Sequence, residues 1–199
     1  MNNLKHIGLA LRNYHATCGS FPPAYIADES GRPMHSWRVL ILPWLGQDEI
    51  YDQYRFDEPW DGPNNRKLHD LTVSAYVCPS HPQERHSTAY TAVVGPGTAW
   101  RGAEPLRLEE IGDGRDRTIL PVEVSAPSIH WMEPRDLEFD RMSLAINGSN
   151  DSAGLSSRHP GGANILLVDG AVRFLKQTLA TNGLRALLTV AGGEEVGEF

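Results

Sequence analysis

The sequence predicts an α+β domain in which an N-terminal amphipathic helix packs on an antiparallel β-sheet with long loop insertions. Three observations lead to this prediction: a helix-spaced apolar stripe at the start of the chain, β-rich segments from residue 89 onward, and a hairpin pattern over residues 157–175. With 199 residues, 40% of them hydrophobic, the chain can bury a core as a single domain over 1–199. Its parts are a first helix within 1–18, helices and loops over 19–88, and the sheet over 89–199.

The first helix is predicted from apolar residues at the three-to-four spacing of one helix face, namely Leu4, Ile7, Leu11 and Tyr14. Asn2 or Asn3 can serve as its N-cap, so we expect a helix over about 3–17. Gly19 ends it, and Pro22 with Pro23 sets an extended connection.

The middle of the chain predicts short helices. Residues 36–54 indicate a helical stretch that is broken at Pro43, and Asn64 with Asn65 favours a cap for a short helix through Leu68 and Leu71.

The second half of the chain predicts strands. Residues 90–94 and 118–124 are β-rich, and Pro121 indicates that the second of these strands is an edge strand or contains a bulge. Residues 126–156 indicate a long surface excursion, and residues 182–189 a short terminal helix.

The hairpin pattern separates His159 from Asp169. A strand over 164–168, at about 3.3 Å per residue, spans roughly 13 Å, so the two residues are not expected to share one metal ion. Asp169-Gly170 suits a type I′ turn, which needs positive φ at both positions. We expect His159 to hydrogen-bond loop carbonyls at the start of the hairpin.

Composition excludes some functions. The net charge is −7 and no cluster of five or more basic residues occurs, so binding to nucleic acid is not expected. No apolar run approaches about 18 residues and no leader is present, so we expect this chain to be soluble.

The spacing of His159 and Asp169-Gly170 resembles the C-terminal His-x9-Asp-Gly element of a planctomycete-type prepilin-like family of unknown function. Further segments match in family order: 2–15, 19–24, 36–45, 58–65, 76–80 and 131–137. The residues of the C-terminal element, taken as a structural motif, are His159, Gly161, Gly162, Asn164, Asp169 and Gly170.

This resemblance implies a pilin-like fold and a non-enzymatic subunit of a cell-surface filament or of a type II secretion-like apparatus. It implies an exported protein whose precursor is anchored in the inner membrane by an N-terminal segment that also carries the methylation site. The partners would be like or related pilin-type subunits. Whether Met1 is the native start stays open.

Two other functions stay open. Trp60, Trp100 and Trp131 lie in polar, Gly/Pro-rich segments, where exposed aromatic rings could bind a solute or a carbohydrate. A hydrolase would combine His159 and Asp169 with Ser156 or Ser157, although no nucleophile elbow occurs.

Two structural features also stay open. No cofactor is expected, but pilin-like heads sometimes bind calcium, for which the acidic candidates are Asp113, Glu123, Glu133 and Asp136. Cys18 and Cys78 could form one disulfide in an exported protein, or each could be a small buried hydrophobic residue.

Overall fold

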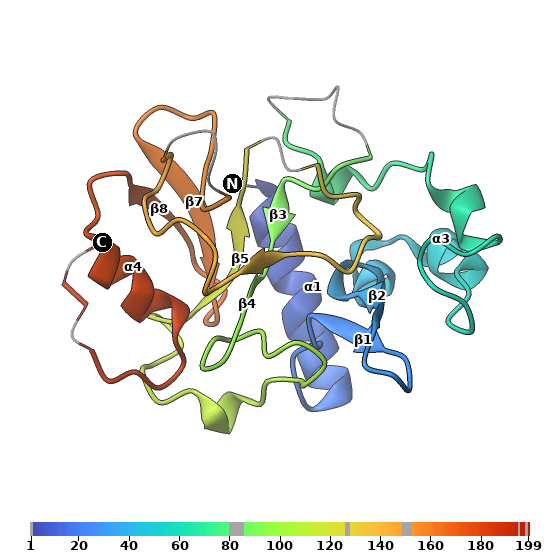
Figure 1. Cartoon of the computed structure of the whole chain (residues 1–199), viewed down its shortest axis with the longest axis horizontal. Coiled ribbons are helices and arrows are strands. Elements are labelled where there is room, and N and C mark those ends of the chain that lie inside the picture. The colour runs from blue at the N-terminus through green and yellow to red at the C-terminus, as the bar shows by residue number, and fades with distance from the viewer. Residues whose placement is uncertain (1, 80–85, 126–127, 149–152, 195, 198) are drawn as a thin grey trace.

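The centre of the molecule is a four-stranded antiparallel sheet with the strand order β3-β5-β7-β8. The computed structural model describes residues 2–79, 86–125, 128–148, 153–194, 196–197 and 199 (Figure 1). The four strands are β3 (Tyr90–Thr91), β5 (Ile119–Glu123), β7 (Gly162–Leu167) and β8 (Val172–Lys176). Helices pack on this sheet, which confirms the predicted α+β class.

Helix α1 (Asn2–Cys18) packs against the sheet at β7. Its buried stripe consists of Leu4, Ile7, Gly8, Ala10 and Leu11. Gly8 allows a close approach, since a Cβ atom at that position would lie 2.8 Å from Leu166 Cδ1. The helix extends one residue further at each end than predicted, so both predicted N-caps, Asn2 and Asn3, lie within it.

Helix α4 (Thr181–Leu188) packs with the residues of β7 that point away from α1. Leu166 belongs to the apolar cluster of α1, whereas Ile165 and Leu167 join Leu184 and Leu187 in a second cluster. This division follows from the alternation of side chains along a strand. All six residues of β7 are consequently buried. None of the helices in the described part of the chain has the length and apolar character needed to cross a bilayer.

The segment between α1 and the sheet forms short elements: β1 (Tyr25–Ala27), β2 (Pro33–Ser36), α2 (Trp37–Leu40), η1 (Leu42–Leu45), α3 (Asp48–Gln53), η2 (Asn65–Leu68) and η3 (Ser74–Tyr76). The helical stretch over 36–54 breaks at Pro43 as predicted, because Pro43 lies in the 3-10 turn η1. Strands β1 and β2 form an antiparallel pair where only an extended connection was predicted.

The predicted asparagine cap near residue 64 is wrong. Element η2 is a single 3-10 turn whose N-cap residue, Asn64, makes no capping hydrogen bond with its side chain. The Asn65 amide instead bridges neighbouring backbone: its Oδ1 accepts from the Arg55 N–H at 2.9 Å, and its Nδ2 donates to the Arg55 and Pro59 carbonyls.

The single strand predicted over 90–94 is interrupted at Ala92. Strand β3 pairs with β5, while β4 (Val93–Val94) pairs in parallel with β6 (Leu137–Glu138). Between them the Ala92 N–H donates to the Asp136 carboxylate at 2.8 Å. The Asp136 side chain thus replaces a backbone carbonyl as the acceptor at the residue where the strand changes its pairing partner.

The surface excursion predicted for 126–156 is also wrong for much of its length. In the described part of it, eight apolar residues are buried with less than a tenth of their surface exposed: Ile129, Trp131, Met132, Leu137, Phe139, Met142, Ile146 and Leu155. The many turn-forming residues of this segment shape an irregular backbone, but the backbone carries large side chains into both apolar clusters. A 3-10 turn, η4 (Leu108–Glu110), precedes β5.

Pro121 lies in an interior strand of the sheet, not at an edge. The pairing of β5 with β7 shifts register between Ile119 and Val122, so the bulge alternative of the prediction holds. Because the register shifts there, the missing N–H of Pro121 costs the sheet no regular ladder bond.

The hairpin between β7 and β8 forms as predicted, but its turn is of another type. Asp169 does not have positive φ; Gly170 alone does, at +92°. The Gly170 N–H donates to the Leu167 carbonyl, and the Leu167 N–H donates to the Ala171 carbonyl. This is a three-residue loop that ends in a left-handed glycine, and Asp169 Oδ1 accepts from the Ala171 N–H at 2.8 Å.

Candidate functional site

A buried ion pair joins α2 to the segment before β6. The Arg38 guanidinium lies 2.6 Å from the Asp136 carboxylate, and the two side chains are 0% and 3% exposed. Arg38 also donates to four backbone carbonyl oxygens, those of Tyr90, Trp131, Glu133 and Arg135. Every nitrogen of the guanidinium therefore has a partner.

The local sequence fixes this arginine from both sides. The Ser36 hydroxyl caps α2 by accepting from the Arg38 N–H, and the Tyr76 hydroxyl donates to the Arg38 carbonyl at 2.6 Å. Burial raises the pKa of Asp136, whereas Arg38 and the donors Ala92 and Trp37 lower it. The pair is closed to solvent and saturated, so we assign it to holding the fold together.

A second polar cluster reaches the surface and brings together Cys78, Glu123 and His159. One ligand atom of each residue, the thiol sulfur, a carboxylate oxygen and a ring nitrogen, lies within 4.8 Å of the others. His159 Nε2 is 3.6 Å from Glu123 Oε1, which is too long for a hydrogen bond. The Glu123 side chain is 5% exposed and that of His159 is 43% exposed, so the cluster opens toward solvent on the histidine side.

Glu123 is the last residue of β5, and β7 orients its carboxylate. Oε2 accepts from both the backbone N–H and the side-chain amide of Asn164, at 3.0 and 2.8 Å. Oε1 is the oxygen that faces His159. Tyr90 borders the same site: burial raises the pKa of its hydroxyl, and the nearby Glu123 and Cys78 raise it further.

The backbone before β7 places His159 over this carboxylate. The Ser157 hydroxyl accepts from the His159 N–H at 2.8 Å, and Gly161 has φ of +89°. A Cβ atom at Gly162 would lie 2.0 Å from the Leu175 carbonyl oxygen, so only glycine fits between β7 and β8 there. The two glycines thus let the chain turn sharply from His159 into the strand.

The four acidic calcium candidates do not converge. Asp113 accepts from the Gly192 and Gly193 N–H groups, and Glu133 pairs with Arg135. Asp136 is bound to Arg38 and Glu123 to Asn164, as described above. Each carboxylate is held by its own donors, and the single metal-type cluster found among the described residues contains only one of the four.

The prediction of exposed binding tryptophans is wrong for two of the three. Trp100 and Trp131 are each 1% exposed and belong to the core. Trp60 is partly buried and stacks on His69 and His130, with ring centroids 5.1 and 5.6 Å apart. Trp60, Trp100 and Trp131 therefore do not form a shared exposed platform.

His130 is held in its neutral form. Its Nε2 lies 3.1 Å from the His69 carbonyl oxygen, and its Nδ1 accepts from the Met132 N–H at 3.2 Å. Burial lowers its pKa below the usual 6.5.

The structure places the residues of the predicted hydrolase triad apart. Asp169 lies past the C-terminal end of β7, where its N–H donates to the Arg115 carbonyl, and His159 lies before the N-terminal end of this strand. The Ser156 hydroxyl accepts from the Ser125 N–H, and that of Ser157 accepts from the backbone of His159. The imidazole faces Glu123.

The two cysteines are free and do not form the disulfide considered from the sequence. Cys18 ends α1, whereas Cys78 follows Val77, whose carbonyl accepts from Asn3 at the other end of the same helix. At about 1.5 Å per residue, the 17-residue helix keeps the two thiols apart. Cys18 is exposed rather than buried.

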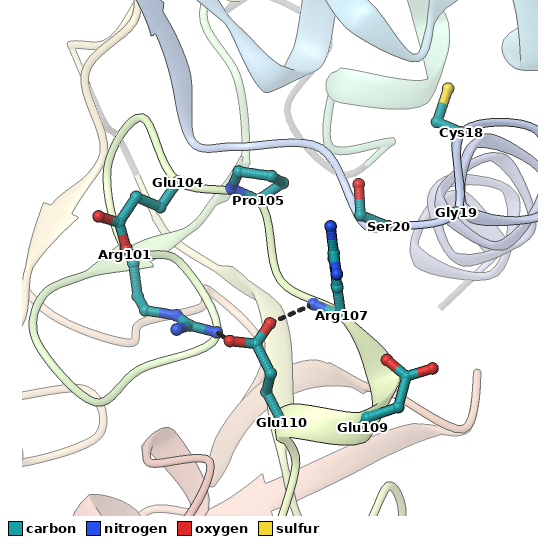
Figure 2. Close-up of a pocket in the computed structure, with 9 residues that line it drawn as sticks. All are labelled: Cys18, Gly19, Ser20, Arg101, Glu104, Pro105, Arg107, Glu109 and Glu110. Atoms are coloured by element: carbon teal, nitrogen blue, oxygen red, sulfur yellow. Dashed lines mark hydrogen bonds and ion pairs between the residues drawn. The ribbon is translucent and has the colours of Figure 1, made fainter.

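A shallow pocket of about 750 Å³ lies between the end of α1 and η4 (Figure 2). Two of its charged side chains pair with each other: Glu110 lies 2.8 Å from Arg101, and it also accepts from the backbone N–H of Arg107 at 2.8 Å. Figure 2 shows Cys18 and Ser20 on the opposite side of this pocket. The site around Glu123 therefore remains the stronger candidate for chemistry.

Comparison with known proteins gives a family but no function. The family model described as "Protein of unknown function (DUF1559)" matches residues 1–107 and 125–182, well over half of the chain. The chain belongs to the DUF1559 family. The matched ranges contain Arg38, Asp136, Cys78 and His159. Glu123 lies outside them, two residues before the second range begins. No curated protein and no solved structure matches this DUF1559 chain.

The residues that sequence reasoning missed are Arg38 and the grouping of Cys78 with Glu123. Arg38 lay within a recognised segment, but nothing in its sequence neighbourhood indicates that its side chain is buried. The signal for the second grouping was weak, because the three residues are far apart in the chain and follow no common spacing motif.

Proposed function

We propose that this DUF1559 protein is a pilin-like, non-enzymatic subunit that assembles with like or related subunits on the cell surface or in a type II secretion-like apparatus. The observation that supports it best is the way α1 lies along the antiparallel sheet with one stripe buried. The opposite side of the helix keeps an apolar residue in solvent, since Leu9 is 58% exposed.

Charge supports assembly through this helix. Residues Asn2–Cys18 include Lys5 and Arg12 but no acidic residue, whereas the whole chain carries a net charge of −7. A basic helix face on an acidic protein favours contact with another copy of the same chain. The proposal includes export and an inner-membrane-anchored precursor.

The other functions have less support. Solute or carbohydrate binding through tryptophans would need exposed rings, and Trp100 and Trp131 are in the core. Hydrolysis would need a hydroxyl within reach of His159, whose ring faces Glu123 instead.

The test is disulfide cross-linking in cells that make the protein from its natural gene. In a Cys18→Ser background, Leu9→Cys places a thiol on the exposed side of α1, and Ile26→Cys places a matched thiol, 38% exposed in its parent residue, on β1. Assembly predicts a disulfide-linked dimer in the surface fraction for Leu9→Cys, because each subunit brings one thiol on α1, with little dimer for Ile26→Cys. A protein that stays monomeric in every fraction, or cross-links equally at both positions, contradicts the proposal.

A further inference from the structure

Cys78, Glu123 and His159 bring a thiol, a carboxylate and an imidazole to one point, and assembly through α1 requires none of them. The three come from the loop after η3, the end of β5 and the turn before β7. Polar side chains can meet without binding an ion, so the distances between their ligand atoms decide whether they form a metal site.

The separations suit a metal better than a direct contact. Two ligand atoms at about 2.0 Å from a tetrahedral ion lie about 3.3 Å from each other. His159 Nε2 and Glu123 Oε1 are 3.6 Å apart, beyond hydrogen-bonding distance but close to this ligand spacing. All three ligand atoms lie within 4.8 Å, so small rotations of the side chains bring each within bonding distance of one ion.

The carboxylate is also oriented as a metal ligand is. Asn164 occupies Oε2 of Glu123 with two donors, which leaves Oε1 directed at His159. Outer hydrogen bonds of this kind fix the ligand carboxylates of metal sites. Asn164 thus satisfies Oε2, whereas Oε1 has no hydrogen-bond partner among the described residues.

The ligand types select the ion. Calcium and magnesium bind oxygen atoms, and a thiol with an imidazole is a poor site for either. Thiolate, imidazole and carboxylate together are ligands for zinc. We infer that Cys78, Glu123 and His159 form a zinc site with three protein ligands.

The fourth position faces solvent. The His159 side chain is 43% exposed, so water can reach the ion from that side while Glu123 lies beneath it. Binding requires the thiolate of Cys78, so the thiol proton passes to solvent when the metal enters. No oxidation or reduction takes part.

The test uses Co²⁺ as a spectroscopic substitute for zinc on the full chain, reduced and freed of metal by chelation. One equivalent should produce a thiolate-to-cobalt charge-transfer band and the strong visible absorption of a tetrahedral ion, and one equivalent of Zn²⁺ should displace both. No band, or a weak spectrum of octahedral cobalt, overturns the inference.

Single variants identify the ligands, and Cys18→Ser is the matched control because it removes the other free thiol. The charge-transfer band should persist in Cys18→Ser and vanish in Cys78→Ser. His159→Ala and Glu123→Gln should weaken Zn²⁺ binding by about 100-fold or more, at least as much as the loss of an outer-shell partner. A band that follows Cys18, or full affinity in His159→Ala, overturns the inference.

Folding is checked separately. His159 is part-exposed in a turn, so His159→Ala should keep the circular dichroism spectrum and the metal-free melting temperature of the parent within about 2 °C. Zn²⁺ should raise the melting temperature of the parent and of Cys18→Ser but not of His159→Ala, since only a site-bound ion stabilises the folded state. A rise of equal size in all three contradicts the site.

Discussion

At the scale of single residues, the burial of Arg38 is a property that the sequence does not predict. Arginine is rarely buried, and its neighbours Trp37 and Val39 give no sign that its guanidinium lies in the core. The partners that make burial possible, carbonyl oxygens of residues 131–135 and the Asp136 carboxylate, lie almost a hundred positions along the chain. Hydrogen bonding between segments so far apart follows no local pattern, so the sequence alone does not pair Asp136 with Arg38.

Asp136→Asn should destabilise the protein by about 3–5 kcal/mol, because it leaves the buried Arg38 charge without its counter-charge. The free energy of unfolding in urea measures this loss. Glu138→Gln is the matched control, since the ion pair of Glu138 with Arg141 is 59% and 80% exposed and contributes at most about 1 kcal/mol. Equal decreases in the free energy of unfolding in the two variants would show that the buried ion pair stabilises the protein no more than the exposed one.

Acid should destabilise the protein through His130. Burial lowers its folded pKa below 6.5, so the unfolded chain binds more protons and stability falls as the pH drops through 6.5. His35, buried against Tyr54, acts in the same direction. Melting temperatures between pH 7.5 and 5.5 measure the slope.

His130→Asn isolates one contribution to this slope. The Asn carbonyl can still accept from the Met132 N–H but does not titrate, so the loss of melting temperature on acidification should be smaller than in the parent. His6→Asn, on the exposed side of α1, is the control and should keep the parent slope. A His130→Asn slope as steep as the parent's would assign the acid sensitivity to other groups.

At the scale of elements, patterns with a short period were predictable. The stripe of α1, the hairpin of β7 and β8 and the terminal helix follow from spacings of two to four residues, and the break at Pro43 follows from the proline itself. The turn type and the switch at Ala92 did not, since each depends on a partner from another segment. Asp-Gly suits a type I′ turn and a glycine bulge alike, and the sequence does not distinguish them.

Gly170→Ala should cost about 1–2 kcal/mol, because a side chain at φ of +92° is strained whatever space surrounds it. Gly197→Ala is the matched control, since Gly197 has no positive φ and a Cβ atom there would meet no atom within 4 Å. Chemical unfolding compares the two. A change below about 0.5 kcal/mol in Gly170→Ala would contradict the assigned turn.

At the scale of the whole molecule, the two apolar clusters share one strand. Residues of β7 alternate between the α1 cluster and the α4 cluster, so neither cluster can lose its packing without exposing β7. The sequence indicates the sheet and both helices but not that the two clusters share β7. It also contains no pattern that predicts the burial of residues 128–148. Large side chains in a segment rich in turn residues have no period from which burial can be inferred.

The shared strand predicts a single unfolding transition. Leu187→Ala, in the α4 cluster, should cost about 2–5 kcal/mol and lower the midpoint seen by tryptophan fluorescence as much as that seen by circular dichroism. The buried tryptophans belong to the other cluster, so fluorescence reports on the side away from the substitution. Leu4→Ala, in the α1 cluster, is the reciprocal control, and midpoints that separate in either variant would indicate two independent units.

The hydrogen bonds from Arg38 to residues 131–135 have a consequence for how this protein can evolve. Three of its contacts there are to main-chain oxygen atoms of residues 131, 133 and 135, which every amino acid supplies. Substitutions at Glu133 and Arg135 can therefore accumulate in related sequences without loss of the hydrogen bonds from Arg38. Divergence should be limited instead at Arg38 and Asp136, which must change together or stay as they are.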